Sequence, residues 1–320
     1  MTTPAHPTRP RPSRTGFTIV ELLVVLAIIL LLIGFIWAAV GTIREQARTT
    51  SCLSNQRQLN LANYGFAADN NGTFMSPRSS PNTDYSPGDD SDIADCSRGG
   101  EQYRLFTQAH EEDGVDRIYQ DNNGRSQEYE LALTDGAAWP YLGSIDVYSS
   151  PLDPTNRIRS YAFNAYVGEI CPDNLPIDQI EEVLSAGWRS ARTLSGLPKP
   201  NETLMTICEE DADENGPAFN NQGWVVKSWT CYQGWWDYPA PWLKQGVTLS
   251  FADGSTEFYK YKTPDLGKVL IENALSGYGY HRATYAGDTQ PYAEHNSDWV
   301  WFANHMLPGR IQDASLGACP

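Results

Sequence analysis

The sequence predicts an α+β protein in which one long N-terminal helix packs on a head built around an antiparallel β-sheet. Two observations lead to this prediction. Residues 17–69 contain no proline, and helix-forming residues persist to about Ala68. Further along, alternating segments separated by turn residues, above all the two that flank Asp253-Gly254, are typical of antiparallel strands. A sheet that buries one face against such a helix gives the α+β class.

The first half of the predicted helix is apolar. The run Phe17–Val40 has 24 residues and a single charged one, Glu21. As a helix it is about 36 Å long, enough to cross a hydrocarbon core of about 30 Å with some tilt. A core helix apolar on every face would be unusual in a domain of this size. Residues 17–40 are therefore predicted to be a transmembrane segment.

Basic residues precede this segment and predict its orientation. Residues 1–16 are rich in Pro, Thr and Arg, carry Arg9, Arg11 and Arg14, and have no acidic residue. Positive charge stays in the cytoplasm, so we expect a single-pass inner-membrane protein with an exported head. An ordinary secretory signal would have a shorter apolar region followed by a small-x-small site, for which Ala38-Ala39-Val40-Gly41 is a weak candidate.

The head is strongly acidic. Of the net charge of −16, residues 1–16 contribute +3 and the apolar run −1, which leaves −18 for residues 41–320. Such a surface repels nucleic acid and anionic lipid, so neither is predicted as a partner. It suits Ca²⁺, which prefers oxygen ligands, but it also simply keeps a protein soluble.

One acidic loop resembles half of a calcium loop. Asp211, Asp213 and Asn215 follow the pattern D-x-D-x-N-G, but position twelve is Gln222 instead of Glu, so a complete EF-hand is excluded. A looser Ca²⁺ site that recruits a neighbouring acid and a solvated acidic loop both remain open. Calcium is the only cofactor that the sequence suggests.

Glu21 is the unusual residue of the apolar run. A carboxylate inside a membrane span is costly and generally marks function, although one near the end of a span can reach the interface. The string from Gly16 through Phe17 to Glu21, followed by Leu22-Leu23-Val24-Val25, resembles the class III signal of type IV pilins and type II secretion pseudopilins.

The resemblance implies a processing route and a role. A prepilin peptidase would cut after Gly16, removing residues 1–16 as a leader, and N-methylate Phe17. Glu21 would attract the N-terminal amine of a neighbouring subunit, and this attraction is strong in a low dielectric. The implied function is that of a structural, non-enzymatic subunit of a type IV pilus-like filament or a type II secretion pseudopilus. Its partners would be the peptidase and other pilin or pseudopilin subunits, in a homo- or hetero-polymer.

The second half of the helix, residues 41–69, is predicted to be a stem that packs on the head. The following residues form an imperfect apolar stripe: Ile43, Ala47, Leu59, Ala62 and Phe66. Asp69-Asn70-Asn71-Gly72 provides a stop, with Gly72 suited to a left-handed cap. Segments of this stem, Ser51–Leu59 and Ala67–Gly72, resemble those of a large group of bacterial pseudopilin-like proteins.

Residues 70–320 form the predicted head, with a long insertion near 76–130. Strands are expected at 160–166, 203–208, 223–229, 247–252 and 255–260. Asp253-Gly254 between the last two predicts a hairpin with a type I′ turn. Val247, Leu249 and Phe251 share one face of their strand and should point toward the core.

The head departs from the pseudopilin-like group at two places. Many members carry a His ten residues before an Asp-Gly pair, and this chain has Leu243 there. A Cys commonly precedes the Pro of the 139–168 block, and Ser150 stands there instead, so the implied disulfide from Cys52 to that place is not available. None of the six cysteines forms a CxxC zinc pattern, and an exported head could pair them, with the connectivity left open.

Two alternatives to a filament subunit remain open. The tryptophans between Trp188 and Trp242 could stack on sugars, although core packing is the commoner use of such residues. A membrane-anchored surface protein that binds glycans or Ca²⁺ without polymerising is therefore the first alternative. A tethered hydrolase is the second, but neither H-E-x-x-H nor G-x-S-x-G occurs, and adjacent Glu209 and Glu210 would point to opposite faces of a strand. No enzymatic activity is predicted.

Overall fold

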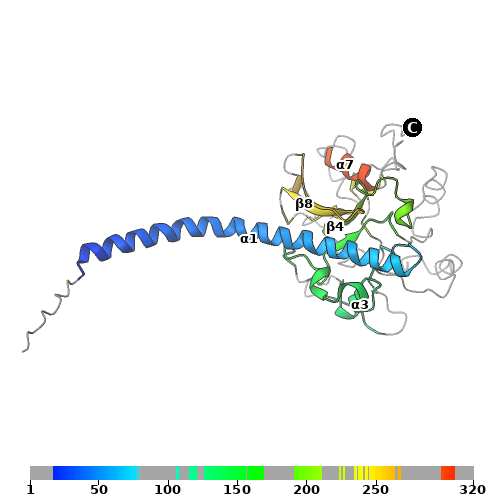
Figure 1. Cartoon of the computed structure of the whole chain (residues 1–320), viewed down its shortest axis with the longest axis horizontal. Helices are drawn as coiled ribbons and strands as arrows, with labels where there is room; N and C mark the ends of the chain where they lie inside the picture. The colour runs from blue at the N-terminus through cyan, green and yellow to red at the C-terminus, as the bar shows by residue number, and fades with distance from the viewer. Residues whose placement is uncertain are drawn as a thin grey trace, which may run out of the picture. The chain divides into compact units, whose positions relative to one another are not determined.

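The computed structural model describes most of the N-terminal helix and the central part of the head (Figure 1). The described residues are 17–77, 79, 106–107, 115–120, 126–155, 157–168, 191–210, 223–224, 226–227, 234–235, 237–240, 242–243, 245–263, 266–267 and 297–306. The chain divides into two units, Met1–Ala47 and Arg48–Pro320. The division falls inside the N-terminal helix.

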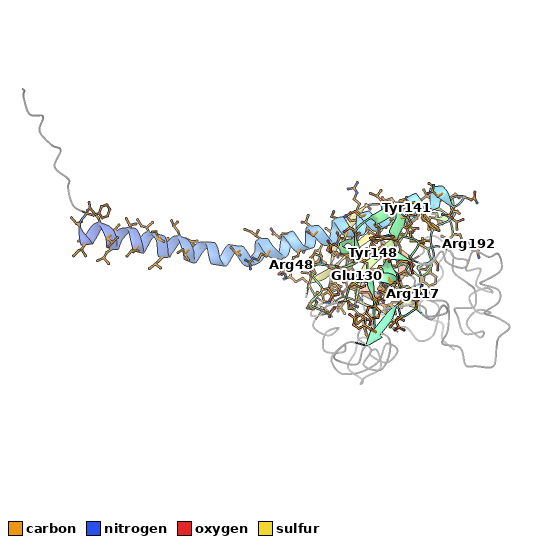
Figure 2. All side chains as sticks on the ribbon, turned by 90° about the horizontal axis from the view of Figure 1, so that it is seen from below. Arg48, Arg117, Glu130, Tyr141, Tyr148 and Arg192 are labelled. Carbon is orange, nitrogen blue, oxygen red and sulfur yellow. The ribbon has the colours of Figure 1, made fainter. Side chains whose placement is uncertain are left out.

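This helix, α1 (Ile19–Asp69), has an uncovered apolar first half. By length and composition it can cross a membrane. The large apolar side chains from Ile19 to Phe35 are 43–79% exposed, and they project from all sides of the helix (Figure 2). An amphipathic helix would show one buried stripe instead.

The end of α1 follows the predicted stop signal. The amide of Gly72 donates to the carbonyl of Ala67 at 2.7 Å, and Gly72 has a left-handed φ of 80°. Asn71, one of the few residue types that tolerate this region, has a φ of 55°. The predicted left-handed cap at Gly72 is therefore confirmed.

The remaining elements are short. The helical ones are α3 (Glu130–Thr134), α4 (Trp139–Leu142), η1 (Ile145–Tyr148), η3 (Leu194–Gly196) and α7 (Ser297–Met306). The strands are β1 (Ile118–Gln120), β2 (Ser126–Glu128), β3 (Tyr161–Phe163), β4 (Leu204–Glu210), β5 (Val226–Lys227), β6 (Gly234–Trp235), β7 (Tyr238–Pro239), β8 (Gly246–Phe251) and β9 (Thr256–Lys260).

An antiparallel sheet organises the head, as predicted. Its strand order is β3-β4-β8-β9, and β7 also pairs with β4. Two small hairpins, β1-β2 and β5-β6, lie outside it. With α1, this sheet confirms the α+β class.

The hairpin between β8 and β9 is confirmed, but the predicted type I′ turn is wrong. A type I′ turn needs positive φ at both central residues, and at this turn only Gly254 has it, with a φ of 88°. The amide of Gly254 donates to the carbonyl of Phe251 at 3.0 Å, and the amide of Phe251 donates to the carbonyl of Ser255 at 2.9 Å. Ala252-Asp253-Gly254 is thus a three-residue loop with glycine in the left-handed position.

Helices cover both faces of this sheet. The second part of α1 lies on one side and α7 on the other (Figure 1). Val247, Leu249 and Phe251 are buried as predicted, and the ring of Phe251 contacts Trp301 of α7. Thr248 and Ser250, which point to the opposite face, are equally buried. This strand is therefore sandwiched between two helices, whereas alternation suggested one buried face.

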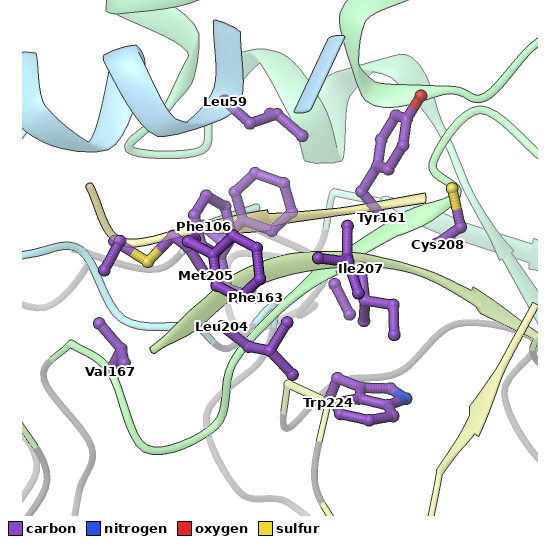
Figure 3. Close-up of a cluster of buried hydrophobic side chains, with 14 of the residues drawn as sticks. Leu59, Phe106, Tyr161, Phe163, Val167, Leu204, Met205, Ile207, Cys208 and Trp224 are labelled. Carbon is purple, nitrogen blue, oxygen red and sulfur yellow. The ribbon is translucent and has the colours of Figure 1, made fainter. Parts of the chain in front are cut away.

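The stem part of α1 contributes directly to the core. Leu59, Ala62 and Phe66 are buried as the predicted stripe requires, and Leu59 points toward the cluster around Phe106 and Met205 (Figure 3). Ile43 is 60% exposed and Ala47 is exposed, so the stripe prediction is wrong for these two residues. Both belong to the first unit of the chain, whereas the buried face of α1 begins at Cys52 in the second.

A buried carboxylate joins α7 to the end of β9. Asp298 is fully buried and accepts hydrogen bonds from the Tyr259 hydroxyl (2.7 Å) and from the amides of Lys262 (2.8 Å) and Thr263 (2.6 Å). Stacking of Tyr259 on Trp301, with ring centroids 4.1 Å apart, reinforces the same junction. The contact thus fixes α7 against the sheet.

The Asp298→Ala variant is expected to lower the free energy of unfolding by about 2–3 kcal/mol, because it removes charged hydrogen bonds and leaves buried donors without an acceptor. Urea denaturation of the full chain in detergent measures this loss. Glu257→Ala, which removes an exposed carboxylate from the same hairpin, is the matched control and should change stability by less than about 0.5 kcal/mol. Equal losses in the two variants would contradict the bridging role of Asp298.

Candidate functional site

The predicted site residues fall into two groups. Phe17 and Glu21 lie at the beginning of the described chain, and Phe17 is 75% exposed. Gly16 lies outside the described residues, as do the predicted calcium ligands Asp211, Asp213 and Asn215. Within the described part of the chain, no three His, Cys, Asp or Glu side chains are grouped so that they could hold a metal.

Glu21 forms a capping box with Thr18. The Glu21 carboxylate accepts from the Thr18 amide and from the Thr18 hydroxyl, both at 2.8 Å. The Glu21 amide in turn donates to the Thr18 hydroxyl oxygen at 3.2 Å. This reciprocal pattern satisfies backbone donors that a helix start leaves without partners, and it places negative charge at the positive end of the helix dipole. Thr18 is thus a capping residue that the sequence interpretation passed over, although T-x-x-E is a readable capping signal.

The capping box allows the helix to begin immediately after Phe17. Because Ile19 is already helical and Glu21 lies in the first turn, the carboxylate is held close to the chain position that processing would turn into the N-terminus. The amine of one chain and the carboxylate of another can then meet at the same level of parallel helices. Geometry of this kind can fix the stagger between identical helices.

A polar seam joins the stem to the sheet, and sequence analysis did not predict it. We use this name for the buried polar side chains between α1 and the strands beneath it. They are Gln56, Asn60 and Asn63 of α1 and Thr206, Thr248 and Ser250 of the sheet.

The amides of the polar seam bond to main-chain groups of the head. Gln56 Nε2 donates to the Thr248 carbonyl and Asn60 Nδ2 to the Phe251 carbonyl, both at 2.9 Å. Asn63 Oδ1 accepts from the Met75 amide at 2.9 Å. Buried amides need such partners, so the seam fixes the rotation and height of α1 on the sheet more strictly than apolar packing would.

Two cysteines lie at one end of the seam. Cys52 Sγ is 3.1 Å from Cys208 Sγ, and the Thr248 hydroxyl lies 2.8 Å from the first sulfur and 3.0 Å from the second. The hydroxyls of Ser150 and Tyr161 each lie 3.3 Å from Cys52 Sγ. Position 150 therefore faces Cys52, as the resemblance to the pseudopilin-like group implies, but it offers a hydroxyl.

Hydrogen bonds make the two thiols chemically different. Burial raises the pKa of Cys52, but hydrogen bonds from Cys208, Ser150, Thr248 and Tyr161 outweigh it and lower that pKa to about 7. Burial raises the pKa of Cys208 well above its usual range. Of the two buried thiols, Cys52 is therefore the more acidic.

Of the clustered tryptophans, Trp224 is a core residue. It is 1% exposed, and its ring packs edge-on against Phe302 with centroids 5.3 Å apart. Trp242 is partly buried, with the Arg157 guanidinium 5.7 Å from its ring centroid. These two support the packing interpretation. Trp188, Trp229 and Trp236 lie outside the described residues.

Comparison with known families gives a match at the N-terminus. Residues 11–37 match the model of the prokaryotic N-terminal methylation motif. This stretch contains Gly16, Phe17, Thr18 and Glu21 and most of the apolar run, and it does not extend into the head. Neither the curated proteins nor the solved structures give a match to the chain.

Proposed function

We propose that this chain, which its methylation motif identifies as a type IV pilin-like or pseudopilin-like protein, is a structural subunit of a pilus-like filament or a type II secretion pseudopilus. The observation that carries the proposal is the combination within residues 11–37. A prepilin-type motif leads directly into a helix whose apolar side chains are uncovered on all sides and whose first turn holds a carboxylate.

The motif implies processing by a prepilin peptidase, and the apolar helix fits a membrane-anchored protein. We place the cut between Gly16 and Phe17. The three arginines of residues 1–16 favour a cytoplasmic N-terminus and a periplasmic head, because basic residues next to a span stay inside. Residues 17–40 then store the subunit in the inner membrane, residues 41–69 form the stem, and residues 70–320 form the head.

Polymerisation is the use that best explains a helix whose described apolar side chains are exposed. In the bilayer, lipid covers the side chains of residues 17–40. On leaving the bilayer these side chains need other apolar cover, and the same segments of neighbouring subunits provide it. Burying Glu21 in such a bundle is favourable only if a positive group pairs with it, and the new amine of Phe17 is one. The assembly partners are therefore other pilin or pseudopilin subunits.

Mass spectrometry of the protein from its native cells tests the processing step. The mature chain is expected to begin with N-methylated Phe17. A Gly16→Val variant should keep residues 1–16, whereas Gly34→Val, a matched change inside the helix where an added Cβ meets no atom within 4 Å, should be processed normally. A mature wild-type chain that still begins at Met1, or that begins after the apolar run, would contradict the proposal.

Crosslinking in membranes tests polymerisation. A ladder of multimers in wild-type cells is expected, and it should disappear in the unprocessed Gly16→Val variant. A correctly cut chain that remains monomeric would refute the filament role. It would favour the alternative of a membrane-anchored surface protein that binds glycans or Ca²⁺ through its head.

A further inference from the structure

Cys52 and Cys208 come from distant parts of the chain and meet in the core. They are 156 residues apart in sequence, one on the stem of α1 and the other on β4. Both are buried, with exposures of 0% and 1%, and their sulfurs are 3.1 Å apart. A sulfur–sulfur bond is about 2.0 Å long, so the two sulfur atoms need to move only about 1 Å closer, which side-chain rotation can provide.

We propose that Cys52 and Cys208 are joined by a disulfide in the mature protein. The bond links the stem helix to the central sheet. This inference rests on the proposed function in one respect, since an exported head folds in an oxidising compartment where such bonds persist. The geometry of the pair does not depend on filament formation.

The chemistry requires an external oxidant, and a protein or small-molecule disulfide supplies it. In one of the two orders, the Cys52 thiolate attacks one sulfur of that disulfide and releases the other as a thiolate, which gives a mixed disulfide on Cys52. Cys208 then loses its proton and attacks Cys52 Sγ, which displaces the second thiolate of the oxidant. Two thiols of the chain lose two protons and two electrons, and the oxidant leaves as two thiols.

In the folded head the hydroxyls of Thr248, Ser150 and Tyr161 lie within 3.3 Å of Cys52 Sγ. These contacts form only as the core closes, so before closure either cysteine can attack the oxidant first. Neither sulfur is accessible in the folded head, so the exchange must precede closure of the core. The bond then encloses a long loop of chain, the arrangement in which a crosslink restricts the unfolded state most.

The disulfide would affect how force passes through the subunit. In the proposed filament, contacts between subunits act on the N-terminal half of α1, whereas the head is held to the second half by the polar seam and by apolar packing. A covalent link at Cys52, near the first buried turn of the stem, prevents the helix from peeling away from the sheet from that end. Such a link would stabilise a filament under load.

Peptide mapping of the full chain tests the proposal directly. Protein extracted from native membranes in detergent is treated with an alkylating agent under denaturing conditions, digested without reductant, and analysed by mass spectrometry. A crosslinked peptide pair that contains Cys52 and Cys208 is expected. The map also identifies any bonds of Cys96, Cys171, Cys231 and Cys319, which lie outside the described residues. Recovery of Cys52 and Cys208 as separate alkylated peptides would contradict the native bond.

Refolding in vitro distinguishes two reasons for a missing bond: Cys52 and Cys208 do not pair, or the head is not exported to an oxidising compartment. Reduced, denatured full chain is refolded in detergent with reduced and oxidised glutathione, and the map is repeated. A Cys52–Cys208 bond that forms here but is missing in cells would mean that the head is not exported. Alkylated Cys52 and Cys208 in both preparations would overturn the disulfide itself.

A stability readout complements the map. Reductant is expected to lower the melting temperature of the wild-type chain by about 5–15 °C. The Cys52→Ser/Cys208→Ser double variant keeps the other four cysteines and should respond to reductant by a clearly smaller shift. The same reductant shift in both proteins would show that the stabilising bond lies elsewhere and would contradict the proposal.

Discussion

The Arg159→Ala variant is expected to lower the free energy of unfolding by about 3–5 kcal/mol, because it leaves a buried carboxylate without its partner. Arg159 Nε lies 2.6 Å from Glu128 Oε2, and the two side chains are 4% and 2% exposed. The second oxygen of Glu128 accepts from the Thr107 hydroxyl at 2.8 Å. The Arg159 guanidinium also lies 5.9 Å from the ring centroid of Phe106. The residue therefore connects β2 with the core around β3.

Urea denaturation of the full chain in detergent measures the loss, and two further variants separate its causes. In Glu128→Leu/Arg159→Met both charges are replaced by apolar groups, so no buried charge is left unpaired and the loss should be much smaller. Lys199→Ala removes a cation from an exposed pair, with Glu202 at 2.9 Å, and should change stability by less than about 0.5 kcal/mol. If Arg159→Ala resembled Lys199→Ala, the ion pair would have no structural role.

Sequence analysis identified the elements with strong local signals. The long helix, its stop at Asp69, the α+β class and the β8-β9 hairpin all follow from periodicity, proline avoidance and turn chemistry. Each of these signals is contained in a few neighbouring residues. The turn type was wrong because Asp-Gly is compatible with both a two-residue and a three-residue loop. Strand register, which depends on the whole sheet, decides between them.

The polar seam could not be predicted because it depends on contacts between residues far apart in the chain. Gln56 and Asn60 are one helical turn apart, which by itself indicates a solvated face. Their burial depends on main-chain carbonyls of β8, about 190 residues further along, that accept their hydrogen bonds. The contact between Cys52 and Cys208 could not be predicted for the same reason, since the spacing of cysteines in a sequence does not determine which of them pair. A useful local signal was present: the run Cys52, Gln56, Asn60, Asn63 borders the apolar stripe of Leu59, Ala62 and Phe66.

The N-terminal site was predictable as a motif, and the structure adds its local mechanics. Sequence analysis named Glu21 for its charge and for its place in the motif. The structure gives the same carboxylate a second task, capping the helix through Thr18. Two explanations therefore exist for a requirement for Glu21: helix initiation within one chain, or attraction between chains. Substitutions that separate hydrogen bonding from charge distinguish them.

The Glu21→Gln variant is expected to be processed and inserted normally but to lower filament yield about tenfold or more. Glutamine can maintain the capping box, since its amide oxygen accepts from the Thr18 amide as the carboxylate does. It has no negative charge to pair with the amine of a neighbouring subunit, and losing one member of a buried charge pair weakens a contact strongly. Filaments sheared from cells and quantified against membrane-bound subunit measure the yield.

The comparison among variants decides which task of Glu21 matters. Thr18→Val removes the hydroxyl of the capping box and keeps the charge, so it should reduce assembly less than Glu21→Gln does. Glu45→Ala, which removes an exposed carboxylate from the same helix beyond the apolar run, is the matched control and should assemble normally. If Glu21→Gln formed filaments as well as the wild type while Thr18→Val did not, the carboxylate would serve helix initiation, and attraction between chains would have to come from another group. Because Glu21 is the only charge between Phe17 and Val40, that result would leave the apolar helices without an electrostatic means of setting their stagger.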